Sequence, residues 1–276
     1  MNKELRLRII SGLALGILLF FFLFYAFKTL FVIITLLLLL VATYEFCTAL
    51  IKKGLRILLP VTFLINCFAF LSLWFFWVGS DEQAFVFLIA MLLGIIFYSF
   101  IRRIDKFRIF LWHIVSLLWL TFPFYAFIRL RFIREEDSLG IYLILFLIIT
   151  VASNDIFAYF GGKQFGKHLL APKISPKKTI EGSLSGIAGG MISGFLYCYF
   201  VFPHFDLISF LTMSFFLIIA SQIGDLAESK FKRYCGIKDS GGIIPGHGGV
   251  LDRIDAFLFS IPLFWCFLYF FGTPLS

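Results

Sequence analysis

Long apolar runs constrain the fold of this chain more than any other feature. Nine runs approach the length of about 20 residues that crosses a hydrocarbon core of about 30 Å. They cover residues 9–27, 29–50, 57–78, 84–101, 109–128, 140–160, 184–203, 207–226 and 254–271. Backbone exposed to lipid must satisfy its own hydrogen bonds, so these runs predict helices. We therefore expect an all-α fold, a polytopic membrane bundle of about nine transmembrane helices.

The composition agrees with a membrane location. The 276 residues are 61% hydrophobic and 14% charged, whereas soluble domains are about 25% charged. The first run follows the basic start MNKELRLR, but its residues are bulky and no small-residue cleavage site follows. We therefore expect an uncleaved first span in place of a signal peptide. The net charge of +8 would hint at nucleic acid in a soluble protein, but in a membrane protein the positive-inside rule explains it.

The basic residues indicate an orientation. With a cytoplasmic N-terminus, nine spans place 20 of the 24 lysines and arginines in inside segments. One missed span would scramble the later loops, so this bias supports both the span count and the orientation. The two longest polar segments, 161–183 and 227–253, then lie on the same cytoplasmic side, and we find no separate soluble domain.

Acidic residues at or inside spans are costly in a membrane and usually have a function. These are Glu45, Asp155, Asp225, Asp252 and Asp255. We expect Glu45, about two turns before Lys52, to pair with a basic group. Asp155, at the end of the sixth run, likewise needs a partner, which a cytoplasmic cation would supply.

The eighth run continues into SQIGDLAESKFKR, residues 221–233. Helical spacing places Gln222, Asp225, Ser229 and Lys232 on one face, which combines an amide, a carboxylate, a hydroxyl and an ammonium group. A solvated helix end with ordinary charge pairs is the alternative.

The stretch KDSGGIIPGHGGVLDRID, residues 238–255, separates the last two runs. Asp252 and Asp255 lie one helical turn apart, and carboxylates together with substrate phosphates are typical Mg²⁺ ligands. Glycines such as Gly248 leave backbone N–H groups accessible to phosphate, and the neighbouring His247 is placed to touch it. Basic residues able to hold an anion are Lys230, Lys232, Arg233, Lys238 and Arg253. Alternatively, this is a re-entrant connection whose acids cap the last helix.

The other polar loop contains ISPKKTIEG, residues 174–182. Ser175, Lys177, Lys178 and Thr179 offer donors to phosphates, which predicts a cationic clamp; an ordinary positive-inside loop is the alternative. The preceding GGKQFGKH is not a Walker loop, because His168 stands where a magnesium-binding hydroxyl is needed.

Residues 229–255, SKFKRYCGIKDSGGIIPGHGGVLDRID, resemble the signature of the phosphatidate cytidylyltransferases, or CDP-diacylglycerol synthases. The matching elements are Ser229, Lys232 with Arg233, Lys238 with Asp239, Pro245 to Gly249, and Asp252, Arg253 and Asp255. ISPKKTIEG, QIGDLAES and NDIFAYFGG are also similar to this family, whereas the first 140 residues match only as apolar spans.

The resemblance implies transfer of CMP from CTP to phosphatidate at the cytoplasmic face of a bacterial cell membrane. It implies Mg²⁺ held by Asp225 and Asp252 with support from Asp255, and phosphate contacts from Ser229, Lys232 and Arg233. Lys177 and Lys178 would clamp the triphosphate or the lipid phosphate. The wider predicted substrate-binding set is Asp155, Ser175, Lys238, Asp239, His247, Gly248 and Arg253. The resemblance also implies a homodimer and a K⁺ ion beside Mg²⁺, which the residues themselves do not indicate.

On this interpretation residues 1–140 form a scaffold and lipid pocket, and residues 141–276 form the catalytic region. The nearest alternative is another CTP-dependent enzyme that acts on a different lipid. An anion transporter is the alternative from another class, but it predicts ionisable residues near the bilayer midplane on several helices. Here the charges concentrate at one face, which favours an enzyme at the membrane surface.

Overall fold

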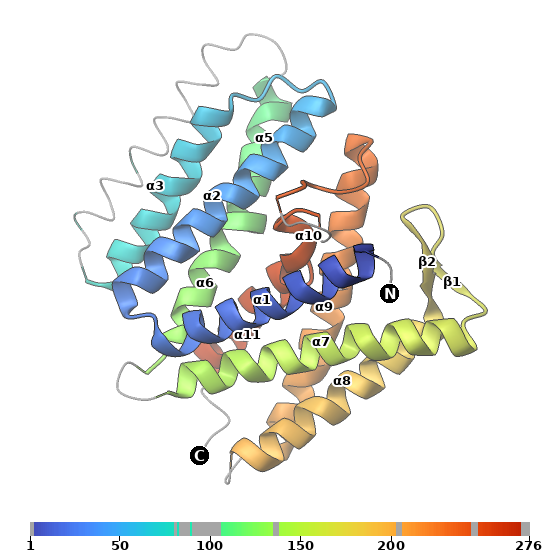
Figure 1. Cartoon of the computed structure of the whole chain (residues 1–276). Helices are drawn as coiled ribbons and strands as arrows, with labels where there is room; N and C mark the ends of the chain where they lie inside the picture. Colours follow the sequence, from blue (N-terminus) through green and yellow to red (C-terminus); the bar gives the residue numbers. More distant parts are fainter. Residues whose placement is uncertain are drawn as a thin grey trace. The chain divides into compact units, whose positions relative to one another are not determined.

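The computed structural model describes residues 3–79, 82, 89, 106–134, 138–202, 206–243 and 248–271. Helices account for nearly all regular structure in these residues, which confirms the all-α class (Figure 1). The helices are α1 (Lys3–Tyr25), α2 (Lys28–Lys52), α3 (Leu59–Trp77), α5 (Lys106–Ser116), α6 (Phe122–Arg131), α7 (Leu139–Phe165), α8 (Ile180–Val201), α9 (Leu207–Cys235), α10 (Leu251–Ile254) and α11 (Phe257–Phe271). A π-helical turn, Leu117–Thr121, joins α5 to α6.

Six helical segments of the described chain are long and apolar enough to cross a membrane. They are Lys28–Lys52, Leu59–Trp77, Phe107–Arg131, Leu139–Phe165, Ile180–Val201 and Leu207–Cys235. Shorter apolar helices, Ser11–Tyr25 and Phe257–Phe271, occupy the positions of the predicted first and last spans. The predicted span at 84–101 lies outside the described residues except for position 89. The count of nine therefore stays a prediction.

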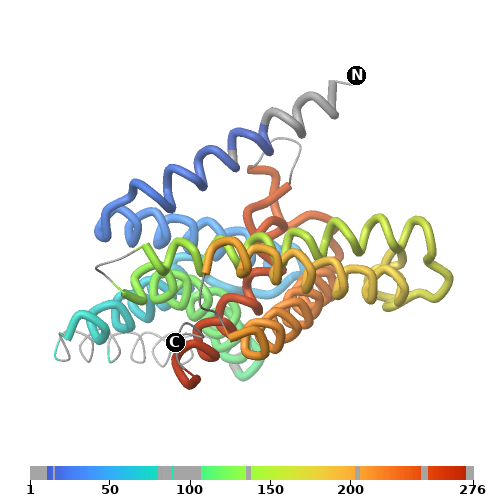
Figure 2. Tube along the Cα trace, turned by 90° about the horizontal axis from the view of Figure 1, so that it is seen from below, coloured from blue at the N-terminus to red at the C-terminus, as the bar shows by residue number. Residues whose placement is uncertain are grey.

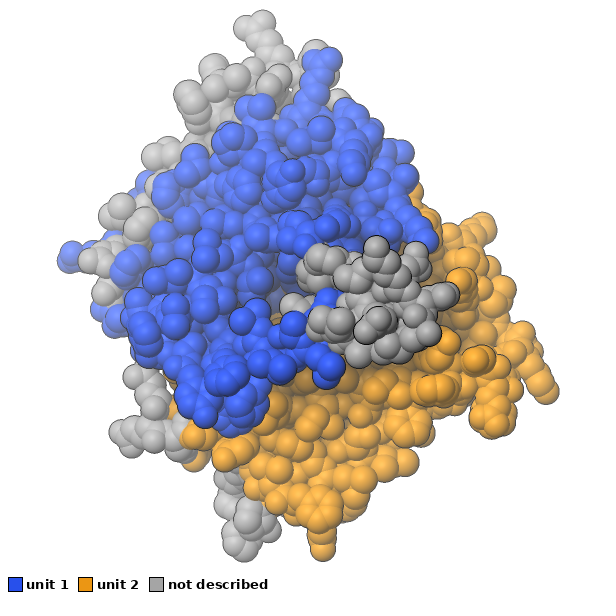
Figure 3. Space-filling view, viewed as in Figure 1, with its two compact units in different colours: residues 1–128, 234–254 blue, residues 129–233, 255–276 orange. Residues whose placement is uncertain are grey.

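The chain divides into two compact units (Figure 3). Unit 1 comprises residues 1–128 and 234–254, and unit 2 comprises residues 129–233 and 255–276. The loop after α9 and the short helix α10 thus belong with the N-terminal helices. The functional division expected at residue 140 stays a prediction.

Unit 1 is built around the packing of α2, α3 and the segment from α5 to the π-helical turn. A buried polar network links these helices: Asn66 donates to Thr43 Oγ1 at 2.9 Å, and Ser116 donates to Asn66 Oδ1 at 3.1 Å. Hydrogen bonds of this kind hold helices together where lipid removes the hydrophobic driving force.

Among the described helices, α7 and α8 of unit 2 make the most extensive contact, and they lie side by side in both views (Figures 1 and 2). Glycines on α8 permit this approach. A Cβ atom at Gly186 would lie 2.6 Å from Asn154 Oδ1, and one at Gly189 would overlap the ring of Phe157. This packing places Asn154, the neighbour of Asp155 in the chain, against α8.

A small antiparallel hairpin, β1 (Leu169–Ala171) with β2 (Ser175–Thr179), connects α7 to α8. Thr179 caps α8 by accepting a hydrogen bond from Gly182 N at 3.1 Å. Glu181 accepts from the backbone N–H groups of Lys167 and His168 and contacts the His168 ring at 2.6 Å. The predicted clamp segment is therefore an ordered strand fixed to the start of α8.

The helix α9 has 29 residues, or about 43 Å at 1.5 Å per residue. This length exceeds a hydrocarbon core of about 30 Å. The helix therefore continues beyond the span that its apolar residues form, as the sequence predicted.

Candidate functional site

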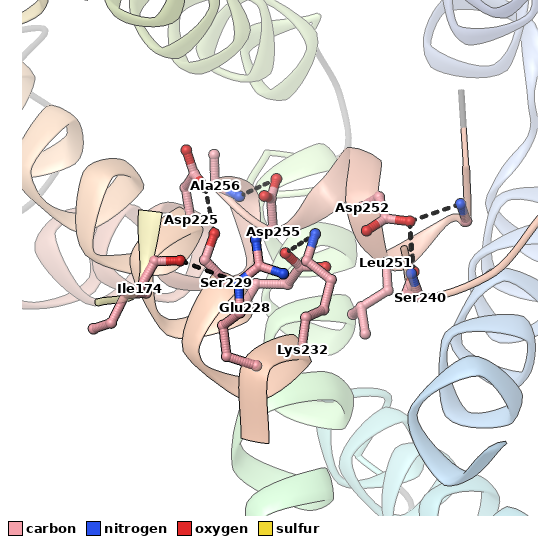
Figure 4. Close-up of polar contacts among 12 residues, drawn as sticks. Ile174, Asp225, Glu228, Ser229, Lys232, Ser240, Leu251, Asp252, Asp255 and Ala256 are labelled. Carbon is pink, nitrogen blue, oxygen red and sulfur yellow. Dashed lines mark hydrogen bonds and ion pairs between the residues drawn. The ribbon is translucent and has the colours of Figure 1, made fainter. Parts of the chain in front are cut away.

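The polar face predicted for α9 is present in unit 2. Asp225, Ser229 and Lys232 are one or two helical turns apart on this helix, and the Ser229 hydroxyl lies 3.5 Å from Asp225 Oδ1 (Figure 4). Arg233 donates from Nε to the carbonyl oxygen of Ile174 at 3.4 Å, which ties the end of α9 to the hairpin. Four of the predicted site residues thus stand on one ordered helix.

The hairpin contributes a cation to this face. Lys178 Nζ forms an ion pair with Asp225 Oδ2, and both side chains are about one-third exposed. Residues next to each other on a strand point to opposite faces. Accordingly Lys177 is exposed, whereas its neighbour Lys178 is half-buried. Of the two predicted clamp lysines, Lys178 is the one that contacts the predicted metal ligand.

Three carboxylates form an acidic cluster in unit 2: Asp155 on α7, Asp225 on α9 and Asp255 before α11. The charge of Asp225 acts on both of the others. Gly224 brings α9 close to Asp255, because a Cβ at this glycine would lie 2.6 Å from the Asp255 carbonyl oxygen. Burial, and to a smaller extent the negative charge of Asp225, raise the pKa of Asp255 to about 7, while Lys232 opposes the rise.

An amide network positions the first member of the acidic cluster. Asn154 donates to Asp155 Oδ1 at 3.0 Å and accepts from Gln222 Nε2 at 2.8 Å. Gln222 also accepts from the Ser183 hydroxyl and donates to the Ser183 carbonyl oxygen at 3.2 Å. This network joins α7, α8 and α9. No sequence motif marks Ser183 as a member of this network, so sequence analysis missed it.

Glu228 is a second residue that sequence analysis missed. Its side chain is fully buried, and its Oε2 forms an ion pair with Lys232 Nζ at 2.5 Å (Figure 4). The two residues are one helical turn apart. The available signal was an acid four residues before a lysine on a predicted helix. Glu228 fixes the position of a lysine that the resemblance assigns to phosphate.

Asp252 lies in unit 1, where it organises the loop between α9 and α10. Its Oδ2 accepts from Ser240 N at 2.9 Å, Ser240 Oγ at 2.9 Å and Gly249 N at 2.8 Å. Asp225 belongs to unit 2, so a metal site shared by Asp225 and Asp252 stays a prediction. Lys238, Asp239 and Arg253 are exposed, and Gly248 adopts a φ of 80° that suits glycine. His247 lies outside the described residues.

Glu45 contradicts the sequence expectation of a basic partner. This carboxylate of α2 is 1% exposed and accepts hydrogen bonds from the loop and from the start of α10. In the described part of the chain its polar contacts are backbone N–H groups and a hydroxyl. The expectation was wrong because backbone donors from residues about 200 positions away can satisfy a carboxylate as well as a nearby lysine can.

Comparison with known proteins supports the signature. The model of the cytidylyltransferase family matches residues 6–271, which is nearly the whole chain. The chain belongs to the cytidylyltransferase family.

Among curated relatives, the phosphatidate cytidylyltransferase of Staphylococcus aureus strain COL is 45% identical over 139 residues, covering 50% of this chain and 54% of the relative. The phosphatidate cytidylyltransferase of Haemophilus influenzae is 40% identical over 147 residues, covering 52% and 51%. The chain thus matches about half the length of these relatives.

The oxygen atoms of the acidic cluster can be compared with the ligands that a divalent cation prefers. The acidic cluster supplies carboxylate oxygens, which are the ligands that Mg²⁺ prefers, and Mg²⁺ commonly takes one or two carboxylates together with substrate phosphates. Among the described residues no group of three or more histidine, cysteine, aspartate or glutamate side chains is placed to hold a metal ion. The carboxylate oxygens have the donor chemistry that suits a cation sharing its coordination with the phosphates of a substrate.

Proposed function

We propose that this cytidylyltransferase transfers CMP from CTP to phosphatidate, which yields CDP-diacylglycerol and pyrophosphate. The observation that supports this most is the acidic cluster with Lys178 and Lys232 beside it, in a chain whose curated relatives are named phosphatidate cytidylyltransferases. We further propose that the site faces the cytoplasm, as the distribution of basic residues favours.

The proposed reaction needs positioning more than proton transfer. An oxygen of the phosphatidate phosphate attacks the α-phosphorus of CTP, and a new P–O bond forms. The bond from the α-phosphorus to the bridging oxygen breaks, and its electron pair leaves with pyrophosphate. Phosphomonoesters have a second pKa of about 6, so the nucleophile is already largely deprotonated at neutral pH. A strong general base is not required.

Charge is the main obstacle, because a triphosphate and a lipid phosphate must approach three carboxylates. Lys178 neutralises part of Asp225, and Lys232 reduces the effect of the cluster on Asp255. We propose Mg²⁺ as the cofactor, held by Asp225 and Asp252 with Asp255 in support. Bound Mg²⁺ would neutralise phosphate charge and polarise the attacked phosphoryl group.

The cationic side chains have distinct proposed tasks. Lys178 holds Asp225 in place from the hairpin, and the exposed Lys177 is available to a phosphate. Ser229, Lys232 and Arg233 would contact substrate phosphates from the end of α9. The homodimer and the K⁺ ion stay predictions.

The test is pyrophosphate release by purified protein in detergent, given CTP, Mg²⁺ and phosphatidate. Asp225→Asn removes the central charge of the acidic cluster. Asp206→Asn is a matched control, because Asp206 is an exposed residue that caps the opposite end of the same helix through Ser209. We expect lipid-dependent release by the wild type and the control and little release by Asp225→Asn.

Other outcomes would change the assignment. Release with a different lipid phosphate, and none with phosphatidate, would retain the CTP site and replace the acceptor. No pyrophosphate release with any lipid acceptor would refute the proposed reaction and favour the anion transporter.

A further inference from the structure

Glu45 is a buried carboxylate on a helix of a membrane bundle, where such a charge is costly unless it is satisfied. The side chain is 1% exposed on α2, among residues that are predominantly apolar. Nothing in the signature assigns it a role, because it lies about 190 residues before the signature loop. Its hydrogen bonds show how this buried charge is satisfied.

Three donors from the signature converge on this one carboxylate. Val250 N donates to Oε1 at 3.0 Å, and Leu251 N donates to Oε2 at 2.8 Å. The Ser240 hydroxyl lies 3.3 Å from Oε2. Both oxygens of Glu45 are therefore used, and two of the donors are consecutive backbone N–H groups. This arrangement fixes the direction in which the chain enters α10.

The loop is shaped around the carboxylate. A Cβ at Gly249 would lie 2.6 Å from both oxygens of Glu45, and a Cβ at Gly241 would lie 2.8 Å from its Cδ atom and overlap Oε1. Side chains at these two positions would expel Glu45 from its place. Two glycines of the signature thus accommodate a carboxylate of the protein itself.

Glu45 is linked to Asp252 through a shared residue. The Ser240 hydroxyl lies 2.9 Å from Asp252 Oδ2 as well as 3.3 Å from Glu45 Oε2. A hydroxyl has one hydrogen to donate, so Ser240 can donate a hydrogen bond to only one of the two carboxylates at a time. Gly249 N completes the link by donating to Asp252 Oδ2 at 2.8 Å. The position of Asp252 depends on the loop that Glu45 holds.

We propose that Glu45 is a positioning residue, which orders the loop between α9 and α10 and so sets the orientation of Asp252 for catalysis. It acts through Ser240 and through the backbone at Val250 and Leu251, without touching substrate. The catalytic half of this inference rests on the proposed cytidylyltransferase reaction, whereas the structural half does not. Residues that orient a metal ligand or catalytic carboxylate typically contribute about 10–100-fold in affinity or activity.

The experiment compares Glu45→Gln with Thr43→Val in the full-length protein in detergent. Glu45→Gln keeps the shape of the side chain but replaces one acceptor oxygen with an NH₂ group that opposes a backbone N–H. Thr43→Val, two residues away on the same helix, removes the hydroxyl that accepts from Asn66 and donates to the Leu39 carbonyl oxygen, and neither partner lies in the loop. It reports what loss of a buried hydrogen bond on α2 does by itself.

Two readouts are needed. Hydrogen exchange measures protection of the amides of Val250 and Leu251, and initial rates give kcat and the half-saturating concentrations of CTP and Mg²⁺. We expect Glu45→Gln to lower protection of these amides, to reduce kcat about 10–100-fold and to raise the Mg²⁺ requirement. A variant that is merely less stable has fewer active molecules, so it lowers the maximal rate at unchanged half-saturating concentrations.

The outcomes separate the two hypotheses. Unchanged amide protection and wild-type kinetics in Glu45→Gln would refute the positioning role. Equal kinetic losses in Glu45→Gln and Thr43→Val, at unchanged half-saturating concentrations, would also refute it and leave only stability. If the wild type fails to make CDP-diacylglycerol, the proposed function fails, and amide protection alone then decides whether Glu45 orders the loop.

Discussion

The buried ion pair between Glu228 and Lys232 offers a way to separate stability from catalysis on α9. Glu228 is fully buried and Lys232 is 16% exposed, with 2.5 Å between Oε2 and Nζ. Lys232 is also a proposed phosphate contact. Loss of activity in a single Lys232 variant would therefore be ambiguous, because the same change also removes a cation that pairs with a buried carboxylate.

The magnitude follows from the distance and the burial. At 2.5 Å and an effective dielectric constant of about 20, two unit charges attract by ~7 kcal/mol. Moving each charge out of water costs several kcal/mol, so the net contribution of the pair is small. Removing one partner is different, because the burial cost of the other remains. We expect Lys232→Met to destabilise the protein by about 3–5 kcal/mol.

The double variant Glu228→Met/Lys232→Met removes both charges and keeps apolar volume in the helix. We expect it to recover at least half of the stability lost in Lys232→Met, as measured by chemical denaturation in detergent. Its rate of pyrophosphate release should stay as low as that of Lys232→Met at temperatures where both are folded. Recovered stability without recovered activity would assign Lys232 to the reaction.

Two results would refute this reasoning. If the destabilisation in the double variant equals the sum of those in the two single variants, Glu228 and Lys232 are not energetically coupled. If the double variant regains the wild-type rate, Lys232 contributes to folding alone and makes no contact that the reaction needs.

Three further predictions concern unit 2. Lys178→Met should lower the rate of pyrophosphate release about 10-fold or more, because it removes the ion pair on Asp225, while Lys173→Met, an exposed change in the same hairpin, should leave the rate unchanged. Gly189→Leu should destabilise the protein by about 1–3 kcal/mol in denaturant, because its side chain overlaps the Phe157 ring between α7 and α8; wild-type stability would contradict this packing. Because burial raises the pKa of Asp255 to about 7, its charged form increases through neutral pH, so a rate that needs the carboxylate should rise between about pH 6 and 8. Asp255→Asn should abolish that limb of the profile, and an unchanged limb would assign it to another group.

The sequence predicted the parts of the structure that depend on local pattern. Apolar length identified the six long membrane helices, because crossing hydrocarbon demands both length and low charge. Helical spacing placed Asp225, Ser229 and Lys232 on one face, because that geometry depends only on the helix period. The hairpin at Ser175–Thr179 was not predicted as a strand pair, since its two short strands lack an apolar alternation.

The contacts that sequence analysis missed are those between distant segments. The hydrogen bonds from Val250 and Leu251 to Glu45 come from backbone N–H groups. Every non-proline residue has such a group, so no residue type in the sequence predicts these bonds. The Asn154, Gln222 and Ser183 network likewise depends on how closely α7, α8 and α9 pack. A motif scan sees residue types and spacings, whereas these contacts depend on the tertiary fold.

The glycines of the signature illustrate the consequence for interpreting motifs. A glycine-rich loop beside basic residues is typical of a phosphate cradle, and that was the prediction from sequence. At Gly241 and Gly249, however, the group that needs the space is the carboxylate of Glu45. A phosphate at these two positions would have to displace a buried anion that already uses the N–H groups of Val250 and Leu251. A Cβ at Gly249 would overlap Ser240 Oγ and lie 2.6 Å from both Glu45 oxygens. Substituting alanine at Gly249 should therefore reduce protection of the Val250 and Leu251 amides, as we expect for Glu45→Gln, and intact protection would contradict this packing.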